Sequence, residues 1–158
     1  MEDALANDYR IEKERLTVVL TMASGERLAG DLFVQSSPRN RYGREDACDI
    51  ANSAEPYFPL LAEGGGTVLV SKDNVRDIAM AADANTEGAW DFGEPTTIEV
   101  TVLGGAVHTG VIHVDAVNGR SRVLDFLNRL HDGFLLLRRA DGGLLVNRRF
   151  IERVRDLG

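Results

Sequence analysis

Side chains that could carry acid–base or metal chemistry are few in this sequence, and their spacing keeps them apart. His108 and His113 stand an odd number of positions apart in an alternating segment, which places them on opposite faces of a strand. Two such histidines cannot share a metal ion without a bulge between them. Cys48 has an apolar helical position with no histidine beside it, which is typical of a core thiol. We therefore expect no catalytic residues, no cofactor and no metal ion, and hence no enzyme.

Two carboxylate–amide pairs stand at matching places in two helical segments. Asn52 follows Asp49 three positions later, and Asn128 follows Asp125 at the same spacing. Side chains three apart share a helix face, so each pair could anchor a loop or bind a partner. In a structural role, the asparagine would cap carbonyls near the helix end and the aspartate would meet a nearby arginine. Because no acid–base partner accompanies both pairs, we expect the structural role.

Basic side chains concentrate near the end of the sequence, in three clusters: Arg138 with Arg139, Arg148 with Arg149, and Arg153 with Arg155. If the first two clusters converge across a hairpin, they could contact an anionic partner; otherwise they form a solvated rim. The whole chain has 25 acidic and 18 basic residues and a net charge of -7. Nucleic-acid binders usually show a basic excess, because much of their affinity comes from neutralising phosphates. The charge therefore counts against nucleic acid, and we expect no DNA binding.

Other features of the sequence bear on its cellular location. No apolar run approaches the roughly 18 residues that a membrane-spanning helix needs, so we expect no membrane partner. The single cysteine excludes an intramolecular disulfide. No basic-then-apolar leader precedes the first periodic segment. These observations predict a cytoplasmic protein.

The sequence contains an internal duplication, because residues 120–154 can be laid over residues 44–78 without a gap. The matched positions include the following pairs: Asp49 and Asp125, Asn52 and Asn128, Phe58 and Phe134, and Gly66 and Gly142. We expect a polar N-terminal segment at 1–15, which either forms a short helix or frays, a first repeat at 16–80, a linker at 81–95 and a second repeat at 96–158. Each repeat has roughly 65 residues, a size at which one core is marginally stable, so the repeats should pack together.

Each repeat predicts the same order of elements: two strands, a short helix, then three strands. Alternating apolar residues on either side of glycine-containing turns indicate hairpins. Gly30 and Gly110 occupy matching mid-strand places. A glycine inside a strand weakens it unless a bend or a close backbone approach requires it, so we expect strongly curved strands. The prediction is a mainly β protein with short inserted helices, made of two tandem small five-stranded barrels related by duplication.

The strand spacing resembles that of the Sm-like (LSm) small β-barrel, and SH3-like barrels share it. The resemblance covers residues 18–34 with 69–78, and residues 98–114 with 145–154. It places possible RNA contacts at Asp115 and Asn118, close to the family's pattern but out of step by a residue or two. Where the family has a basic residue followed by glycine at the later corner, this sequence has Lys72 with Asp73 and, in the second repeat, two arginines. The helix also lies between the second and third strands, whereas the family has it in front.

These observations favour a non-catalytic interaction module, an adaptor or scaffold that binds protein through barrel edges or rims. The partner is expected to be another protein, with further copies of the chain among the candidates. The alternative is an Sm-like RNA-binding protein that uses the arginine-rich second repeat. The contacts in that case would be the following residues: Asp115, Asn118, Arg138, Arg139, Arg148 and Arg149.

Overall fold

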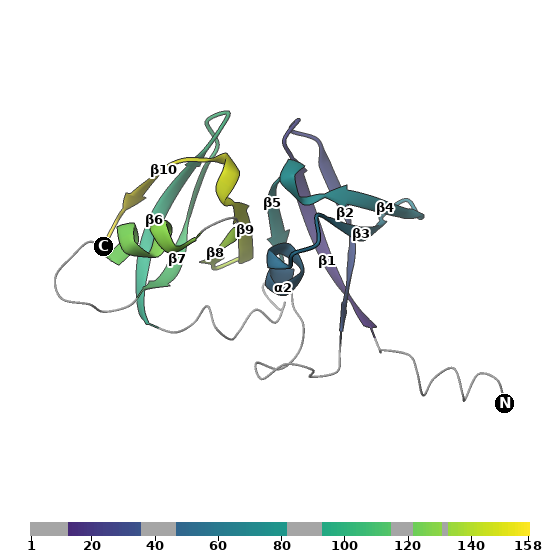
Figure 1. Cartoon of the computed structure of the whole chain (residues 1–158), viewed down its shortest axis with the longest axis horizontal. Coiled ribbons are helices and arrows are strands. Elements are labelled where there is room, and N and C mark those ends of the chain that lie inside the picture. Colours follow the sequence, from purple (N-terminus) through teal and green to yellow (C-terminus); the bar gives the residue numbers. More distant parts are fainter. Residues whose placement is uncertain (1–12, 36–46, 82–92, 115–121, 131–132) are drawn as a thin grey trace.

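The computed structural model describes residues 13–35, 47–81, 93–114, 122–130 and 133–158 (Figure 1). We call residues 13–81 the first half and residues 93–158 the second half. The expected N-terminal helix at 1–15 lies outside the described residues, except that residues 13–15 belong to a strand. Most of the expected linker at 81–95 also lies outside them.

Both halves contain the order of elements that the sequence predicts. The first half consists of β1 (Lys13–Met22), β2 (Arg27–Gln35), α2 (Ala47–Asn52), β3 (Tyr57–Ala62), β4 (Thr67–Ser71), the 3-10 helix η1 (Lys72–Asn74) and β5 (Val75–Met80). The second half consists of β6 (Glu94–Val102), β7 (Val107–Val114), α3 (Arg122–Arg129), β8 (Phe134–Arg139), β9 (Gly142–Asn147), the 3-10 helix η3 (Arg148–Phe150) and β10 (Ile151–Asp156). The chain is thus mainly β with two short inserted α-helices in its described part.

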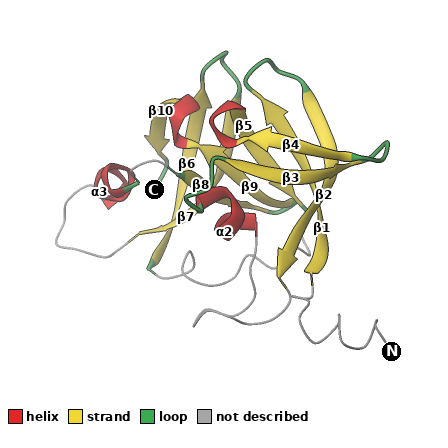
Figure 2. Cartoon of the chain, turned by 45° about the vertical axis from the view of Figure 1, so that its right-hand side comes forward, coloured by secondary structure: helices red, strands yellow, loops and turns green. Residues whose placement is uncertain are grey.

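The described residues form one continuous antiparallel sheet of ten strands, in the order β10-β6-β7-β8-β9-β5-β1-β2-β3-β4. The order inside the two halves is the same, and the halves join where β9 pairs with β5. In Figures 1 and 2, β5 and β9 lie side by side at the centre, while β4 and β10 lie on opposite sides of the molecule. The sheet is not closed, so the predicted pair of separate barrels is not confirmed. The physical reason is that β9 pairs across the halves, which leaves β4 and β10 as the ends of an open sheet.

Equivalent hydrogen bonds hold the corner of each half. The Ala23 N–H donates to the Asn74 carbonyl at 2.7 Å, and the Leu103 N–H donates to the Phe150 carbonyl at 2.8 Å. Each bond ties the first hairpin of a half to the 3-10 helix that precedes its last strand. The 3-10 helices η1 and η3 therefore occupy the same place in the two halves.

The strand pairing shows that, over part of its length, the alignment of the two halves must be displaced by one residue. Tyr57 pairs with Ser71 and Phe134 pairs with Asn147, and these two partners directly precede η1 and η3. Phe134 therefore takes the place of Tyr57, and the place of Phe58 is taken by Leu135. The shift arises because Phe134 follows the matched Asn128 by six positions, whereas Tyr57 follows Asn52 by five. Between the equivalent pairs Leu61–Thr67 and Arg138–Gly143, the turn of the second half is one residue shorter.

Two apolar cores share the hairpin β8–β9. Side chains of a strand alternate between its faces, and in β8 and β9 both faces are buried. Phe134, Leu136 and Leu145 pack into the core of the first half, together with α2 and β5. The second core takes the intervening side chains: Leu135, Leu137, Leu144 and Val146. One hairpin thus forms a wall of both cores, which explains why its sequence is apolar on both faces.

The two mid-strand glycines are explained by close approach of a neighbouring strand. A Cβ added at Gly30 would overlap the Leu61 carbonyl oxygen of β3. A Cβ at Gly110 would lie 2.9 Å from the Leu137 Cβ and 3.1 Å from the Arg138 carbonyl oxygen of β8. Glycine therefore allows the third strand of each half to approach the second closely. A close backbone approach was one of the two reasons that the sequence offered for a glycine inside a strand.

Candidate functional site

The junction between the halves begins with a short ladder of paired strands. Asp77, Ile78 and Ala79 of β5 pair with Val146, Leu145 and Leu144 of β9. Leu145 is completely buried there, in the same cluster as Ile78. Strand pairing and apolar burial therefore coincide at this junction.

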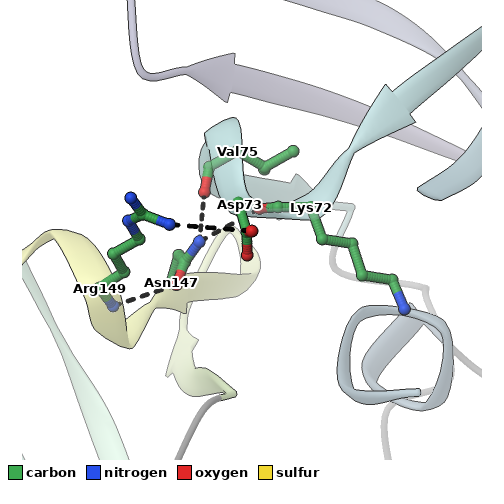
Figure 3. Close-up of polar contacts among 5 residues, drawn as sticks. All are labelled: Lys72, Asp73, Val75, Asn147 and Arg149. Carbon is green, nitrogen blue, oxygen red and sulfur yellow. Dashed lines mark hydrogen bonds and ion pairs between the residues drawn. The ribbon is translucent and has the colours of Figure 1, made fainter. Parts of the chain in front are cut away.

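Asn147, the last residue of β9, joins the two halves through its side chain (Figure 3). Its Nδ2 donates to the Val75 carbonyl at 2.8 Å and to the Lys72 carbonyl at 3.2 Å. Its Oδ1 accepts a hydrogen bond from the Arg149 N–H at 3.0 Å, which caps η3. The side chain is buried and both of its polar atoms are bonded, as a buried amide requires. The first half carries Ser71 at this place, where no side-chain cap bond forms.

Asn52, the last residue of α2, makes a second bridge between the halves. Its Oδ1 accepts a hydrogen bond from the Phe134 N–H at 2.7 Å, and its Nδ2 donates to the Phe134 carbonyl at 3.5 Å. The sequence suggested that this amide would cap its own helix, but it bonds to β8 instead. Gly133 permits the approach, since a Cβ there would lie 2.7 Å from the Asn52 Oδ1. The structural role is retained, with a different partner.

A polar hollow of about 510 Å³ lies beside these bridges. Its lining includes three basic side chains, Lys72, Arg148 and Arg149, and two acidic ones, Glu55 and Asp73. Burial lowers the pKa of Lys72, while the charge of Glu55 acts in the opposite direction. The hollow combines charges of both signs, so its net positive charge is small.

The basic groups in the hollow already have partners within the chain. Lys72 Nζ donates to the Ser53 hydroxyl at 2.6 Å and to the Ser53 carbonyl at 3.1 Å. Arg149 Nη1 lies 3.8 Å from Asp73 Oδ2, and both side chains are exposed (Figure 3). An anion that entered the hollow would compete with these contacts, which limits what the site offers to a phosphate.

A second polar cluster lies along β5. Asp77 is buried, and its Oδ2 lies 3.8 Å from His108 Nε2, which is too long for a hydrogen bond. Burial raises the pKa of Asp77, although His108, the Thr21 hydroxyl and nearby arginines counteract it. Burial also lowers the pKa of His108, which Asp77 opposes and Arg139 and Arg76 reinforce. Among the described residues, His108 Nε2 is buried without a hydrogen-bond partner. The cluster thus places a buried histidine nitrogen beside a buried carboxylate, with no hydrogen bond between them.

The arginine pairs of the second half do not converge. Arg138 and Arg139 pair with Gly143 and Gly142, beside the β8–β9 turn. Arg148 and Arg149 follow Asn147, at the other end of the same hairpin. Five residues of strand separate the two ends, which is roughly 16 Å. The hollow contains the second pair without the first.

Other sequence-predicted positions stay apart from the junction. Asp49, Asp125 and Asn128 are exposed on their helices. Asp115 and Asn118 lie outside the described residues. The repeat-matched asparagines therefore differ, because Asn52 binds the neighbouring half and Asn128 faces solvent.

The two ends of the sheet have unpaired edges within the described part of the chain. The end at β4 is apolar: Leu69 is 70% exposed, Tyr57 of the adjacent β3 is 58% exposed and Val68 is 39% exposed. The other end is β10, where Arg153 and Arg155 are exposed. Residue types alone did not indicate the β4 edge, since the alternation of this segment is also that of an inner strand.

Within the described ranges, no group of three or more histidine, cysteine, aspartate or glutamate side chains is arranged to hold a metal ion. None of the helices described is long and apolar enough to cross a membrane. No family model matches this sequence, and no significant match is found among curated proteins or solved structures.

Proposed function

We propose that this chain is a non-catalytic protein-interaction module, an adaptor or scaffold, whose binding surface is the β4 edge. The observation that carries the proposal is the exposure of Leu69, Val68 and Tyr57 at the outer edge of β4, which has no partner strand in the described part of the chain. We further infer that the two halves are copies of one small-barrel unit of the Sm-like or SH3-like kind. Their shared strand order and the equivalent corner bonds support this inference.

An edge strand presents a row of unpaired N–H and C=O groups that can pair with another strand. Stable soluble proteins usually protect such edges with charged residues or proline. The middle of β4 instead has Val68 and Leu69, both exposed. Burying a large apolar side chain contributes about 1.5–3 kcal/mol, so a partner strand would gain both backbone pairing and apolar burial here.

The test is affinity capture with matched surface variants. The immobilised chain, in wild-type, Leu69→Lys and Val107→Lys forms, is incubated with nuclease-treated extract of its native cells. Val107 is a suitable control because it is also exposed but lies in β7, an inner strand that is separated from β10 by β6 and from β4 by the rest of the sheet. We expect the wild type and Val107→Lys to retain the same protein, and Leu69→Lys to lose it. Equal retention by all three, or retention of none, would refute binding through the β4 edge.

RNA binding is the second candidate, and its support is the presence of Lys72, Arg148 and Arg149 around one hollow. The opposing carboxylates and the existing contacts of Lys72 and Arg149 make it the weaker one. A salt titration against labelled single-stranded RNA tests it, with an Arg148→Glu, Arg149→Glu double variant as control. RNA binding requires an affinity that falls steeply with salt and is lost in the variant. Absence of binding at low salt would exclude this candidate.

A further inference from the structure

We propose that the partner at the β4 edge is a second copy of this chain, with β10 of one copy paired to β4 of the next. This inference rests on the proposed function, because it identifies the partner of the same edge. The argument starts from the junction already present inside the chain, where β9 pairs with β5.

The chain contains both members of a second junction, but it cannot form that junction with itself. β9 is the fourth strand of the second half, and β5 is the last strand of the first half. The corresponding strands are β4, the fourth strand of the first half, and β10, the last strand of the second. These two are the ends of the open sheet and lie on opposite sides of the molecule (Figures 1 and 2). A contact between such different surfaces is heterologous and joins copies head to tail.

The internal junction also predicts the register of the new one. η1 and η3 occupy equivalent places, so β4 corresponds to β9 and β10 to β5 without a gap. Leu145 pairs with Ile78 inside the chain, and their counterparts are Leu69 and Val154. We expect Leu69 of one copy to pair with Val154 of the next, with Val70 opposite Arg153 and Val68 opposite Arg155.

The exposed apolar residues of the β4 edge are those that such a junction would bury. Leu145, Phe134 and Leu136 of the second half lie buried in the core of the first half. The strand register gives their counterparts, all of them exposed: Leu69, Tyr57 and Pro59. Ordinary surface exposure would not be expected to select these three positions together. Their exposure is explained if the next copy buries them in the same way that the first half buries Leu145, Phe134 and Leu136.

The receiving surface consists of α3 and β10. Inside the chain, α2 packs against β8 and its Asn52 bonds to the Phe134 backbone. The equivalent residue of α3 is Asn128, which is exposed, and the equivalent of Phe134 is Tyr57. Asn128 of one copy would therefore face Tyr57 of the next without the same bond, because Pro56 stands at the place of Gly133 and its Cβ would meet the amide. Leu124 on the same helix corresponds to the buried Cys48 and is 56% exposed, so it too would be covered.

Charge and hydrogen bonding show how the two junctions differ. Arg149 and Asp73 form the ion pair of the internal junction, and each occupies the other's place in the opposite half. The same two side chains would face each other between copies, with their sides exchanged, so each would be shared between the internal ion pair and the new contact. Asn147, however, corresponds to Ser71, whose shorter side chain cannot make the same two bonds to the facing carbonyls. We expect the junction between copies to be weaker than the internal one, so that assembly depends on protein concentration.

The experiment measures molar mass by light scattering and sedimentation over a rising series of protein concentrations. Leu69→Lys blocks the β4 end, and a Leu124→Lys, Asn128→Lys double variant blocks the β10 end. All three positions are exposed, so the folded chain should tolerate them, and circular dichroism verifies this. Val107→Lys serves again as the control. We expect the wild type and the control to assemble beyond a dimer and each blocked variant to remain a monomer.

Mixing the two blocked variants tests the head-to-tail geometry directly. Each retains the end that the other lacks, so an equimolar mixture should form a dimer of one copy of each and nothing larger. Assembly of both blocked variants to the wild-type mass, or a mixture that stays monomeric, would overturn the proposal. A wild type that is monomeric at every concentration would overturn it as well. If the wild type is monomeric but still captures a different protein through Leu69, the proposed function stands and only self-association is rejected. If it neither assembles nor captures a protein, both proposals are rejected.

Discussion

Asn147→Ala should destabilise the whole chain, because this amide holds the two halves together. The substitution removes two hydrogen bonds that cross to Val75 and Lys72 and a third that caps η3. A buried hydrogen bond contributes about 1 kcal/mol, so the expected loss is about 3 kcal/mol. For a chain of this size that corresponds to a fall in Tm of roughly 6–12 °C.

Two matched variants separate the contributions, with thermal and urea unfolding followed by circular dichroism. Asn147→Ser loses the reach to the facing carbonyls, and the equivalent Ser71 makes no side-chain cap bond, so its stability should be close to that of Asn147→Ala. Ser71→Ala changes the equivalent residue of the first half, where no side-chain cap bond exists, and should change stability by less than about 0.5 kcal/mol. The reasoning would be refuted if Asn147→Ala were as mild as Ser71→Ala, since the bridge would then contribute nothing.

Two further substitutions test the close strand packing and the polar cluster. Gly30→Ala should lower the unfolding free energy by about 1–3 kcal/mol, because the added methyl group overlaps the neighbouring strand. Gly64→Ala, in an open turn, should change the unfolding free energy little. Urea unfolding of both variants makes the comparison. His108 has a lowered pKa in the fold, so the stability that its neutral form provides is present above pH 6.5 and is lost as pH falls through the folded pKa. Asp77 has a raised pKa, so its contribution runs the other way, and stability is recovered as it protonates at lower pH. Tm measured from pH 8 to pH 5 should fall below pH 6.5 in the wild type and fall less in His108→Leu; equal curves would contradict the role of His108.

Much of the local structure follows from the sequence, because alternation and turns are local signals. The strands, the two helices and their order could be predicted from apolar spacing and glycine-containing turns. Residues 134–137 are apolar on both faces of their strand, and the fold buries all four of them. The reason for that burial, a hairpin shared between two cores, depends on the pairing of β9 with β5, and no local pattern specifies that pairing.

The candidate site was harder to predict for the same reason. The sequence identified Asn52 as structural, but its partner Phe134 lies in the other half. The arginine pairs are close in sequence, yet a hairpin separates them by its whole length. The exposed edge at Leu69 could not be foreseen, because the same alternating residues would be buried if β4 were an inner strand. Strand order decides these features, and it arises from contacts between distant segments.

The difference between Ser71 and Asn147 gives a prediction in which affinity increases. Ser71→Asn would supply the amide that the junction between copies lacks, aimed at the backbone ahead of β10 in the next copy. Gaining one or two hydrogen bonds of about 1 kcal/mol each should tighten self-association roughly fivefold to thirtyfold. In the monomeric Leu69→Lys background the new amide can only cap η1, as Asn147 caps η3, so the thermal stability there should rise by no more than this one bond of about 1 kcal/mol. Sedimentation equilibrium of Ser71→Asn and Ser71→Ala measures the effect. An unchanged association constant would show that the internal junction is not a guide to the contact between copies.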